Sequence, residues 1–406
     1  MDIDLYSPEV YGRGAPHEQF KWLRENEPVF WHPIVDQPLP GDPQTGPGFW
    51  CLTRYKDIEH ASKDFRHYSS AGGTNIVDPV SGVELMMINT DPPYHTKLRS
   101  IVSKGFHPKA VALIEEHIRD IVTNILDRVA TKGECDFVTE IAAELPLEVI
   151  AEFMGVPVED RHKIFEWTNT MIAQGADPEY SPNLEDATRA FIAISEYANT
   201  LADLRKDDPQ ADLISKIIHT EVDGEYLNTL EYDMFFVMLA VAGNETTRNL
   251  ISGGMFALIE NPEQREILLA NPSKMPLAVE EMLRWVTPVM HFRRTATEDF
   301  EIGGKTIKRG DKILLWYLSG NRDEEVFEDP YAFNVLRDPN PHMTFGAGGP
   351  HFCLGFSLAQ LEIRVMFEEL LRRFPDMELT GPIQRLHSNF IRGIRHMPVK
   401  FTPEHV

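Results

Sequence analysis

One stretch of this 406-residue chain decides its fold: Phe345-Gly346-Ala347-Gly348-Gly349-Pro350-His351-Phe352-Cys353-Leu354-Gly355. Its glycine-dense turn delivers a cysteine to the start of a helical pattern, because apolar residues follow at spacings of four, three and four: Leu354, Leu358, Leu361 and Val365. A sulfur at a helix N-terminus faces unpaired backbone N–H groups and the positive end of the helix dipole. This position is therefore predicted to favour the thiolate form of Cys353.

The glycines around Cys353 indicate what kind of group this thiolate could bind. Because they lack a Cβ atom, they let the backbone approach a large, flat group. A thiolate presented in this way is a good axial ligand for haem iron, to which it donates electron density that favours O–O cleavage. The alternative is a buried structural cysteine after a glycine-rich loop, which is the ordinary role of an isolated cysteine.

The same loop resembles the haem-binding signature of the cytochromes P450, with Phe, Gly, Gly, His, Cys and Gly in order. One residue more separates Phe345 from Cys353 than in the commonest bacterial form, which we interpret as the mark of a subgroup. The resemblance implies a mainly α fold with a minor β region, in which haem lies between a long central helix and the cysteine loop. It also implies haem b (iron protoporphyrin IX) as the cofactor and Cys353 as the metal ligand.

The composition of the chain bounds its class. A sequence that is 42% hydrophobic can build a large core, and without a linker-like segment we expect residues 1–406 to form a single domain. The N-terminal residues lack the basic and apolar regions of a secretion signal. The longest apolar stretch, Met234–Ala242, is too short to span a bilayer. We expect a soluble, cytoplasmic monomer.

Cysteine usage and charge exclude further classes. Three widely spaced cysteines, Cys51, Cys135 and Cys353, argue against a disulfide framework and for a reducing compartment. The formal net charge of −24 argues against nucleic acid as a partner, because binding to phosphates requires basic surfaces.

Hydrophobic periodicity predicts helices over most of the chain: Pro16–Asn26, Pro92–Ser103, Pro108–Ala130, Val138–Phe153, Leu184–Lys206, Leu227–Glu260, Met275–Val286 and Cys353–Phe374. Strand patterns are few and short, with a possible hairpin in the last twenty residues: Phe49–Thr53, Phe292–Thr295, Phe300–Ile302 and Lys312–Trp316. The stretch Pro33–Gly48, rich in proline and glycine, indicates a surface loop.

A polar interruption marks the longest of these helices. Residues 234–241 are apolar on every face, which predicts a buried helix, and they run into Ala242-Gly243-Asn244-Glu245-Thr246-Thr247-Arg248-Asn249. Thr246 could hydrogen-bond back to the carbonyl of Ala242 and bend the helix beside Gly243. The alternative is that the helix surfaces after Val241. That alternative suits Arg248 and Asn249, but not the apolar residues that return further along.

The P450 resemblance assigns roles within this interruption. Gly243 would leave room above the iron, Thr246 would hydrogen-bond the activated oxygen, and Glu245 would relay protons inward. The family most often has Asp where this chain has Glu245. Because peroxide-using relatives typically lack the acid–alcohol pair, its presence favours a monooxygenase over a peroxygenase.

Two further groups match positions of the family. Glu281 and Arg284 resemble its Glu-x-x-Arg motif, and Arg337 resembles the second arginine that completes a structural network bracing the cysteine loop. Four cations lie where the family binds the haem propionates: His95 and Arg99, four apart on one helical face, together with Arg294 and His351. Any one of them alone would be interpreted as a surface charge. We leave His342 as a loop histidine.

Electrons must come from another protein, because the chain has no G-x-G-x-x-G nucleotide fingerprint after a strand. A ferredoxin and its reductase, fed by NAD(P)H, are the partners that the resemblance implies. Six basic residues could form a docking face, although solvated helix faces explain them equally well: Lys97, Lys104, Lys109, Arg364, Arg372 and Arg373.

The substrate is expected to be a hydrophobic small molecule. Four mostly apolar segments are candidate pocket walls: Asn75–Met87, Met171–Pro182, Val289–Phe292 and Asn389–Ile391. The run 241–249, the lengthened cysteine loop, Leu315-Trp316-Tyr317 and Phe390-Ile391-Arg392-Gly393-Ile394 resemble bacterial enzymes that hydroxylate methyl-branched lipids and sterol side chains. Related members accept terpenes.

The sequence thus predicts a haem-thiolate monooxygenase that inserts one atom of O2 into a C–H bond of a branched lipid, sterol side chain or terpenoid. The alternatives are a non-catalytic haem-thiolate sensor or carrier, which would not need the Glu245–Thr246 pair, and a peroxide-driven peroxygenase.

Overall fold

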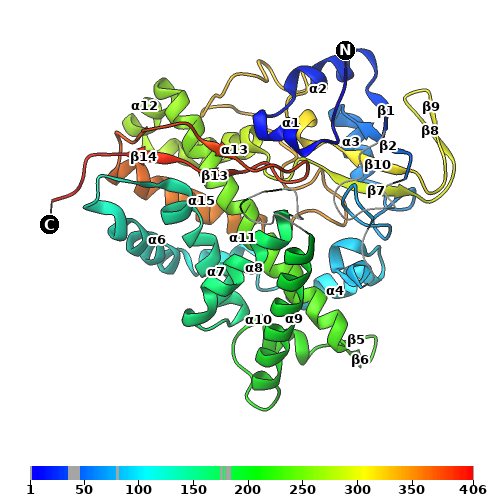
Figure 1. The fold of residues 1–406 in the computed structure, drawn as a ribbon, viewed down its shortest axis with the longest axis horizontal. Coiled ribbons are helices and arrows are strands. Elements are labelled where there is room, and N and C mark those ends of the chain that lie inside the picture. Colours follow the sequence, from blue (N-terminus) through cyan, green and yellow to red (C-terminus); the bar gives the residue numbers. More distant parts are fainter. Residues whose placement is uncertain are drawn as a thin grey trace.

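Helices make up most of the computed structural model, which describes residues 2–34, 46–78, 82–173, 177, 179 and 184–405. The α-helices are α1 (Pro8–Arg13), α2 (His17–Asn26), α3 (Tyr55–Lys63), α4 (Tyr94–Val102), α5 (Pro108–Ala112), α6 (Glu115–Ala130), α7 (Glu144–Met154), α8 (Arg161–Ala173), α9 (Leu184–Lys206), α10 (Leu213–Ile218), α11 (Thr229–Glu260), α12 (Pro262–Ala270), α13 (Met275–Val286), α14 (Tyr317–Gly320) and α15 (Phe356–Arg373). The predicted mainly α fold with a minor β region is confirmed (Figure 1).

The β region is built from short strands: β1 (Val29–Pro33), β2 (Gly48–Leu52), β3 (Tyr68–Ser69), β4 (Glu134–Asp136), β5 (Glu221–Val222), β6 (Glu225–Tyr226), β7 (Phe292–Ala296), β8 (Phe300–Ile302), β9 (Lys305–Ile307), β10 (Lys312–Leu315), β11 (Glu378–Leu379), β12 (Gln384–Arg385), β13 (Ile394–His396) and β14 (Pro398–Lys400). The largest sheet has the order β1-β2-β10-β7-β3, and only its β2–β10 pair is parallel. In Figure 1 this sheet lies at the upper right, beside the helical part of the molecule.

Helix α11 runs through the middle of the helical part (Figure 1) and contacts α7, α8, α9, α13 and α15. It begins with a capping box, in which the Asn228 side chain accepts from the backbone N–H of Glu231 and the Glu231 carboxylate accepts from the N–H of Asn228. Apolar side chains on all its faces, including Phe235, Phe236 and Leu239, join the main hydrophobic core. These contacts fix the helix as the axis around which the other helices pack.

Two predicted helices are divided in the structure. The segment 108–130 forms α5 and α6, separated by the highly exposed Leu113. The segment 138–153 begins as a π-helix, Val138–Ala142, before α7. Pro146 explains where α7 starts, because proline has no N–H and fits only the first turn of an α-helix.

The C-terminal hairpin predicted within the last twenty residues is wrong. Strand β13 pairs with β12, which precedes that segment, and β14 pairs with β11 and with the distant β4. Six of the described helices lie outside the predicted ones, because they are short or their apolar residues follow no clear period: α1, α3, α8, α10, α12 and α14. Most of the predicted loop 33–48 lies outside the described residues.

A helix that crosses a bilayer must be both long and predominantly apolar. None of the described helices, α11 included, combines the length and the apolar character that a membrane span needs.

Candidate active site

The loop that carries Cys353 is held by its own backbone. The N–H of Cys353 donates to the carbonyl of Phe345 at 2.8 Å. Gly346, Gly348 and Gly349 have φ values of 88°, 89° and 78°, a left-handed conformation that glycine adopts without strain. At Gly349 a Cβ atom would lie 2.1 Å from the backbone oxygen of Ser62, at the end of α3. Gly348 and Gly349 therefore serve the turn and its packing on α3.

Cys353 lies three residues before the first helical residue of α15, Phe356, and not at the helix start as predicted. Burial raises the pKa of its thiol, while the backbone N–H of Gly355 and the charge of Arg99 act in the opposite direction. The predicted net lowering of the Cys353 pKa is thus wrong for the polypeptide alone. A coordinated metal cation deprotonates a thiol outright, so the thiolate would come from the metal and not from the helix.

The four predicted propionate ligands come together beside Cys353. His95 and Arg99 belong to α4, Arg294 to β7 and His351 to the cysteine loop. The rings of His95 and His351 have centroids 4.1 Å apart. Burial and then the Arg294 charge lower the pKa of His351 to about 2, which places this arginine close to the histidine pair.

The environment of these cations suits an anionic ligand. Among the described residues, neither Arg99 nor Arg294 pairs with a carboxylate, and burial lowers the pKa of both guanidinium groups. His95 Nδ1 and His351 Nε2 are buried without a hydrogen-bond partner in the part of the chain that the structure describes. Buried cations and orphaned ring nitrogens require a counter-charge and hydrogen-bonding partners. The residues present therefore fit the two propionates of haem.

In its middle, between buried residues, α11 presents an accessible face. Ala242 is exposed and Thr246, one turn later, is half-buried. The predicted back-bond is confirmed, because Thr246 Oγ1 donates to the carbonyl of Ala242 at 2.9 Å. Gly243 also serves helix packing: a Cβ atom there would lie 2.7 Å from Cγ1 of Ile150, so its absence lets α7 and α11 approach closely. Ala242 is the exposed small residue of this face, and its neighbour Gly243 is half-buried.

The interruption in α11 does not bring the helix to the surface. Glu245, Arg248 and Asn249 are at most 2% exposed, which rules out the alternative that α11 emerges after Val241. The carboxylate of Glu245 contacts the guanidinium of Arg248, and that guanidinium also donates to Asn169 of α8. Burial raises the pKa of Glu245, and the charge and hydrogen bond of Arg248 oppose this shift.

The structural network predicted beneath the loop is confirmed. Glu281 is fully buried and accepts from Arg284 at 2.7 and 2.8 Å and from Arg337 at 3.1 Å. The two arginines also donate to backbone carbonyls between residues 321 and 332. His342 lies in a loop and pairs with Glu280 at 2.9 Å. These bonds tie α13 to the segment that leads into the cysteine loop.

Two of the predicted pocket walls lie side by side. Val289 forms an isolated β-bridge with Ile391, and the rings of Phe292 and Phe390 have centroids 5.7 Å apart. A third wall, Asn75–Met87, is attached to the sheet by Asp78. The fourth, Met171–Pro182, falls largely outside the described residues. The described walls remain mostly apolar, as predicted.

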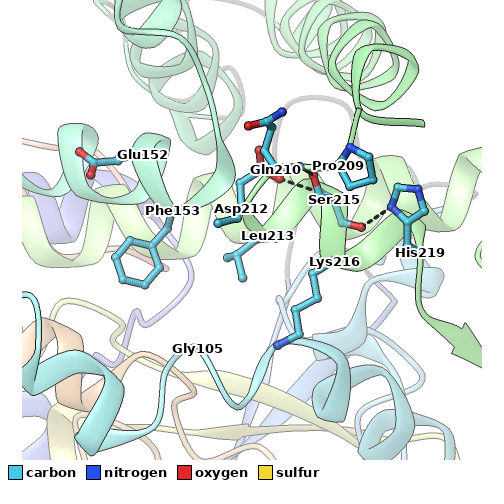
Figure 2. Close-up of a pocket in the computed structure, with 11 residues that line it drawn as sticks. Gly105, Glu152, Phe153, Pro209, Gln210, Asp212, Leu213, Ser215, Lys216 and His219 are labelled. Atoms are coloured by element: carbon cyan, nitrogen blue, oxygen red, sulfur yellow. Dashed lines mark hydrogen bonds between the residues drawn. The ribbon is translucent and has the colours of Figure 1, made fainter. Parts of the chain in front are cut away.

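A surface pocket of about 880 Å³ lies between α7, α10 and the chain at Gly105 (Figure 2). None of its lining residues belongs to the predicted site. Its polar groups have structural partners: Asp212 caps α10 by accepting from the N–H of Ser215, and His219 Nδ1 bonds the Ser215 carbonyl. This pocket is therefore distinct from the site around Cys353.

A family model for cytochrome P450 matches residues 47–395. This chain is a cytochrome P450. The steroid C26-monooxygenase of Mycolicibacterium smegmatis is 41% identical to this P450 over 409 residues, covering 99% of this chain and 94% of the relative. The methyl-branched lipid omega-hydroxylase of Mycobacterium tuberculosis is 42% identical over 390 residues, covering 94% and 90%. The P450 is accordingly an oxidoreductase of the monooxygenase class.

Solved structures agree with this assignment. A Mycobacterium marinum cytochrome P450 in complex with pseudoionone superposes on this P450 with a TM-score of 0.93, at 39% identity and with 99% of both chains covered. Membership of the family implies haem and O2 as cofactor and co-substrate.

Sequence reasoning missed two residues of this P450 site. Asn169 lies on α8, a helix that was not predicted, and nothing in its local sequence marks it. Arg248 was given no role at the site, and it was named only as a residue that a surfacing helix would suit. Its spacing of three from Glu245 is a signal that could have found the pair, because residues three apart on a helix are neighbours.

Proposed function

We propose that this P450 inserts one atom of O2 into a C–H bond of a branched lipid or a sterol side chain, with electrons from a ferredoxin and its reductase. The observation that carries the proposal is the placement of Cys353 beside Arg99, with His95, Arg294 and His351 gathered as an anion-binding group. When bound at Cys353, haem b supplies the activation of O2 and the oxygen transfer.

The residues of the chain orient this chemistry. Arg99 and Arg294, which form no ion pair among the described residues, and the two histidines, whose His95 Nδ1 and His351 Nε2 lack hydrogen-bond partners there, would hold the propionates. Thr246 has its hydroxyl hydrogen engaged by the Ala242 carbonyl, which leaves its oxygen lone pairs free to accept a proton or a hydrogen bond. Glu245 would bring protons to it from the buried side of α11.

The substrate class rests on the relatives and on the apolar walls. The named relatives are a steroid C26-monooxygenase and a methyl-branched lipid omega-hydroxylase. Val289, Phe292 and Phe390 are half-buried apolar residues in the paired segments of this chain. Such a surface suits a hydrocarbon chain or ring system better than a charged substrate.

Most of the basic face proposed to receive the redox partner is neutralised within the protein. Four residues of the candidate docking face already pair with carboxylates: Lys97, Arg364, Arg372 and Arg373. Lys104 and Lys109 form no ion pair among the described residues, so the face would depend on these two lysines. We further propose that the protein is monomeric, consists of a single domain and lies in the cytoplasm. Its electrons would come ultimately from NAD(P)H.

A spectrum and a turnover assay test the proposal. Reduced protein under carbon monoxide should give the red-shifted Soret band of a haem thiolate. The band should be lost in Cys353→Ser and kept in Cys135→Ser, a matched control at a half-buried cysteine of β4. A Cys353→Ser protein that kept the band would refute the ligand assignment.

Turnover separates the remaining alternatives. With ferredoxin, reductase and NAD(P)H, the enzyme should hydroxylate methyl-branched fatty acids or sterols from a panel that also holds linear acids and terpenes. Product from peroxide alone, with none from the electron-transfer system, would identify a peroxygenase. A thiolate spectrum without turnover under either condition would identify a sensor or carrier.

A further inference from the structure

The carboxylate of Glu245 lies inside the protein, on the side of α11 that packs against α8. Its residue is 1% exposed, and Oε2 contacts Nη2 of Arg248, one turn later on the same helix. Oε1 is buried and has no hydrogen-bond partner in the described part of the chain. A buried carboxylate is costly unless a cation compensates it, and Arg248 supplies that cation.

Arg248 is in turn held by α8. Its Nη1 donates to Oδ1 of Asn169, and its guanidinium lies 5.8 Å from the centre of the Phe165 ring. One turn earlier on α11, Asn244 donates to Thr168 Oγ1 at 3.3 Å. These contacts set the guanidinium in one place. Arg248 thus connects the carboxylate of Glu245 to α8, a helix that the sequence analysis did not predict.

The carboxylate and the hydroxyl of the acid–alcohol pair lie on different faces of α11. Glu245 and Thr246 are consecutive, so their side chains leave the helix about 100° apart. Thr246 faces the accessible side with Ala242, whereas Glu245 is enclosed. Because Oε2 is engaged by Arg248, Oε1 is the oxygen that remains available for a proton.

We propose that Arg248, anchored by Asn169, is a positioning residue that keeps Glu245 ionised and leaves Oε1 available to pass protons toward Thr246. Oε1 takes up a proton that arrives from the solvent side and releases it toward Thr246, which restores the carboxylate–guanidinium pair; no electron moves in this step. The inference rests on the proposed function and names a residue that regulates its proton supply. Burial raises the pKa of Glu245 and Arg248 opposes the shift, as the proposal requires.

An infrared titration tests this role without turnover. In protein carrying 13C-labelled glutamate, the carboxylic acid band that disappears in Glu245→Gln reports the protonation of Glu245. In Arg248→Gln its midpoint should move up by roughly 1–3 pH units, the shift that an adjacent arginine causes in a carboxyl group. Asn169→Leu should move it in the same direction by less.

A matched control comes from an exposed pair. Arg189 contacts Glu185 and Asp186 on α9, again at helical spacing, so Arg189→Gln should leave the midpoint unchanged. Unchanged midpoints in both Arg248→Gln and Asn169→Leu would overturn the proposal and leave Arg248 as a packing residue. If Arg248→Gln does not fold, Arg248→Lys and Asn169→Leu carry the test, and unchanged midpoints in both overturn it.

Coupling provides the second readout. In Arg248→Gln, the amount of product formed per NAD(P)H consumed should fall by about tenfold or more. This is less than the roughly 100-fold or greater effect on rate of a positioned proton-transfer group. Peroxide-driven product formation should persist, because peroxide brings its own protons. Arg248→Lys should restore part of the coupling. If the wild-type enzyme shows no O2-dependent product, the proposed function fails, while the infrared titration still decides the role of Arg248.

Discussion

At Thr246, one hydroxyl group performs two tasks on α11. It donates its hydrogen to the Ala242 carbonyl, and it presents its oxygen on the accessible face. Alanine at position 246 would preserve the helix, because alanine has a high helix propensity. It would remove the hydroxyl oxygen that can accept a hydrogen bond. Removal of this side chain therefore tests the role proposed for Thr246 in oxygen activation without disturbing the fold.

Thr246→Ala should lower product per NAD(P)H by about tenfold and raise the release of peroxide, because proton delivery near the reacting oxygen is lost. The thiolate spectrum should not change. Oxygen-electrode and peroxide assays measure the ratio. Thr200→Ala is the matched control, since Thr200 makes the same back-bond to the Glu196 carbonyl at 3.0 Å on α9. Unchanged coupling in Thr246→Ala would remove Thr246 from the relay.

At the scale of elements, the C-terminal end of α13 is held by arginines. Arg322, 1% exposed, donates at 2.9 Å to the carbonyls of Arg284 and Trp285, and Arg392 donates at 2.8 Å to those of Trp285 and Val286. The last carbonyls of a helix have no partners within the helix, and cations suit the negative end of its dipole. These two side chains fix the helix that carries the Glu281 network.

Arg322→Met should lower the free energy of unfolding by about 1–3 kcal/mol, because buried carbonyls lose their donors. Denaturation in urea, followed by circular dichroism, measures the loss. Arg309→Met, at an exposed arginine, should change the same quantity by less than about 0.5 kcal/mol. An Arg322→Met protein as stable as the wild type would show that burying the charge costs as much as its bonds contribute.

The sequence predicted most of the helices whose ends are fixed by neighbouring residues, such as capping residues. Helix α13 was predicted with its observed limits, and α11 begins two residues later than predicted, where the Asn228 capping box stops it. The start of α15 was placed too early because the bond from Cys353 N–H to the Phe345 carbonyl holds the cysteine in the loop. The predicted C-terminal hairpin failed because β14 pairs with β4, more than 260 residues away.

At the scale of the whole molecule, buried neutral histidines couple stability to acid. His291 is fully buried between Trp316 and Phe390, and burial lowers its pKa to about 3. Burial, followed by the charges of nearby arginines, also lowers the pKa of His17 well below its usual value. Below about pH 6.5 the unfolded chain binds protons that the native state does not, so unfolding becomes easier as pH falls.

His291→Phe should reduce this pH dependence. Between pH 6.5 and pH 5, a histidine that stays neutral in the native state costs roughly 2 kcal/mol of stability, at about 1.4 kcal/mol per pH unit. The difference in unfolding free energy between pH 7 and pH 5 should shrink by that amount in His291→Phe. His162→Phe, at an exposed histidine, should leave the difference unchanged. Equal pH dependence in wild type and His291→Phe would show that His291 becomes protonated in the native state.

The sequence by itself determined the family, the helical character, the cysteine proposed as the ligand and the identities of most charged residues around it, because each is written in a short run of neighbouring residues. The tertiary structure decided where those residues act. It packed Gly243 against Ile150, placed Cys353 three residues before α15, where burial raises the pKa of its thiol, and joined Arg248 to Asn169. Burial and contacts between distant segments set these properties, and neither can be read from local periodicity.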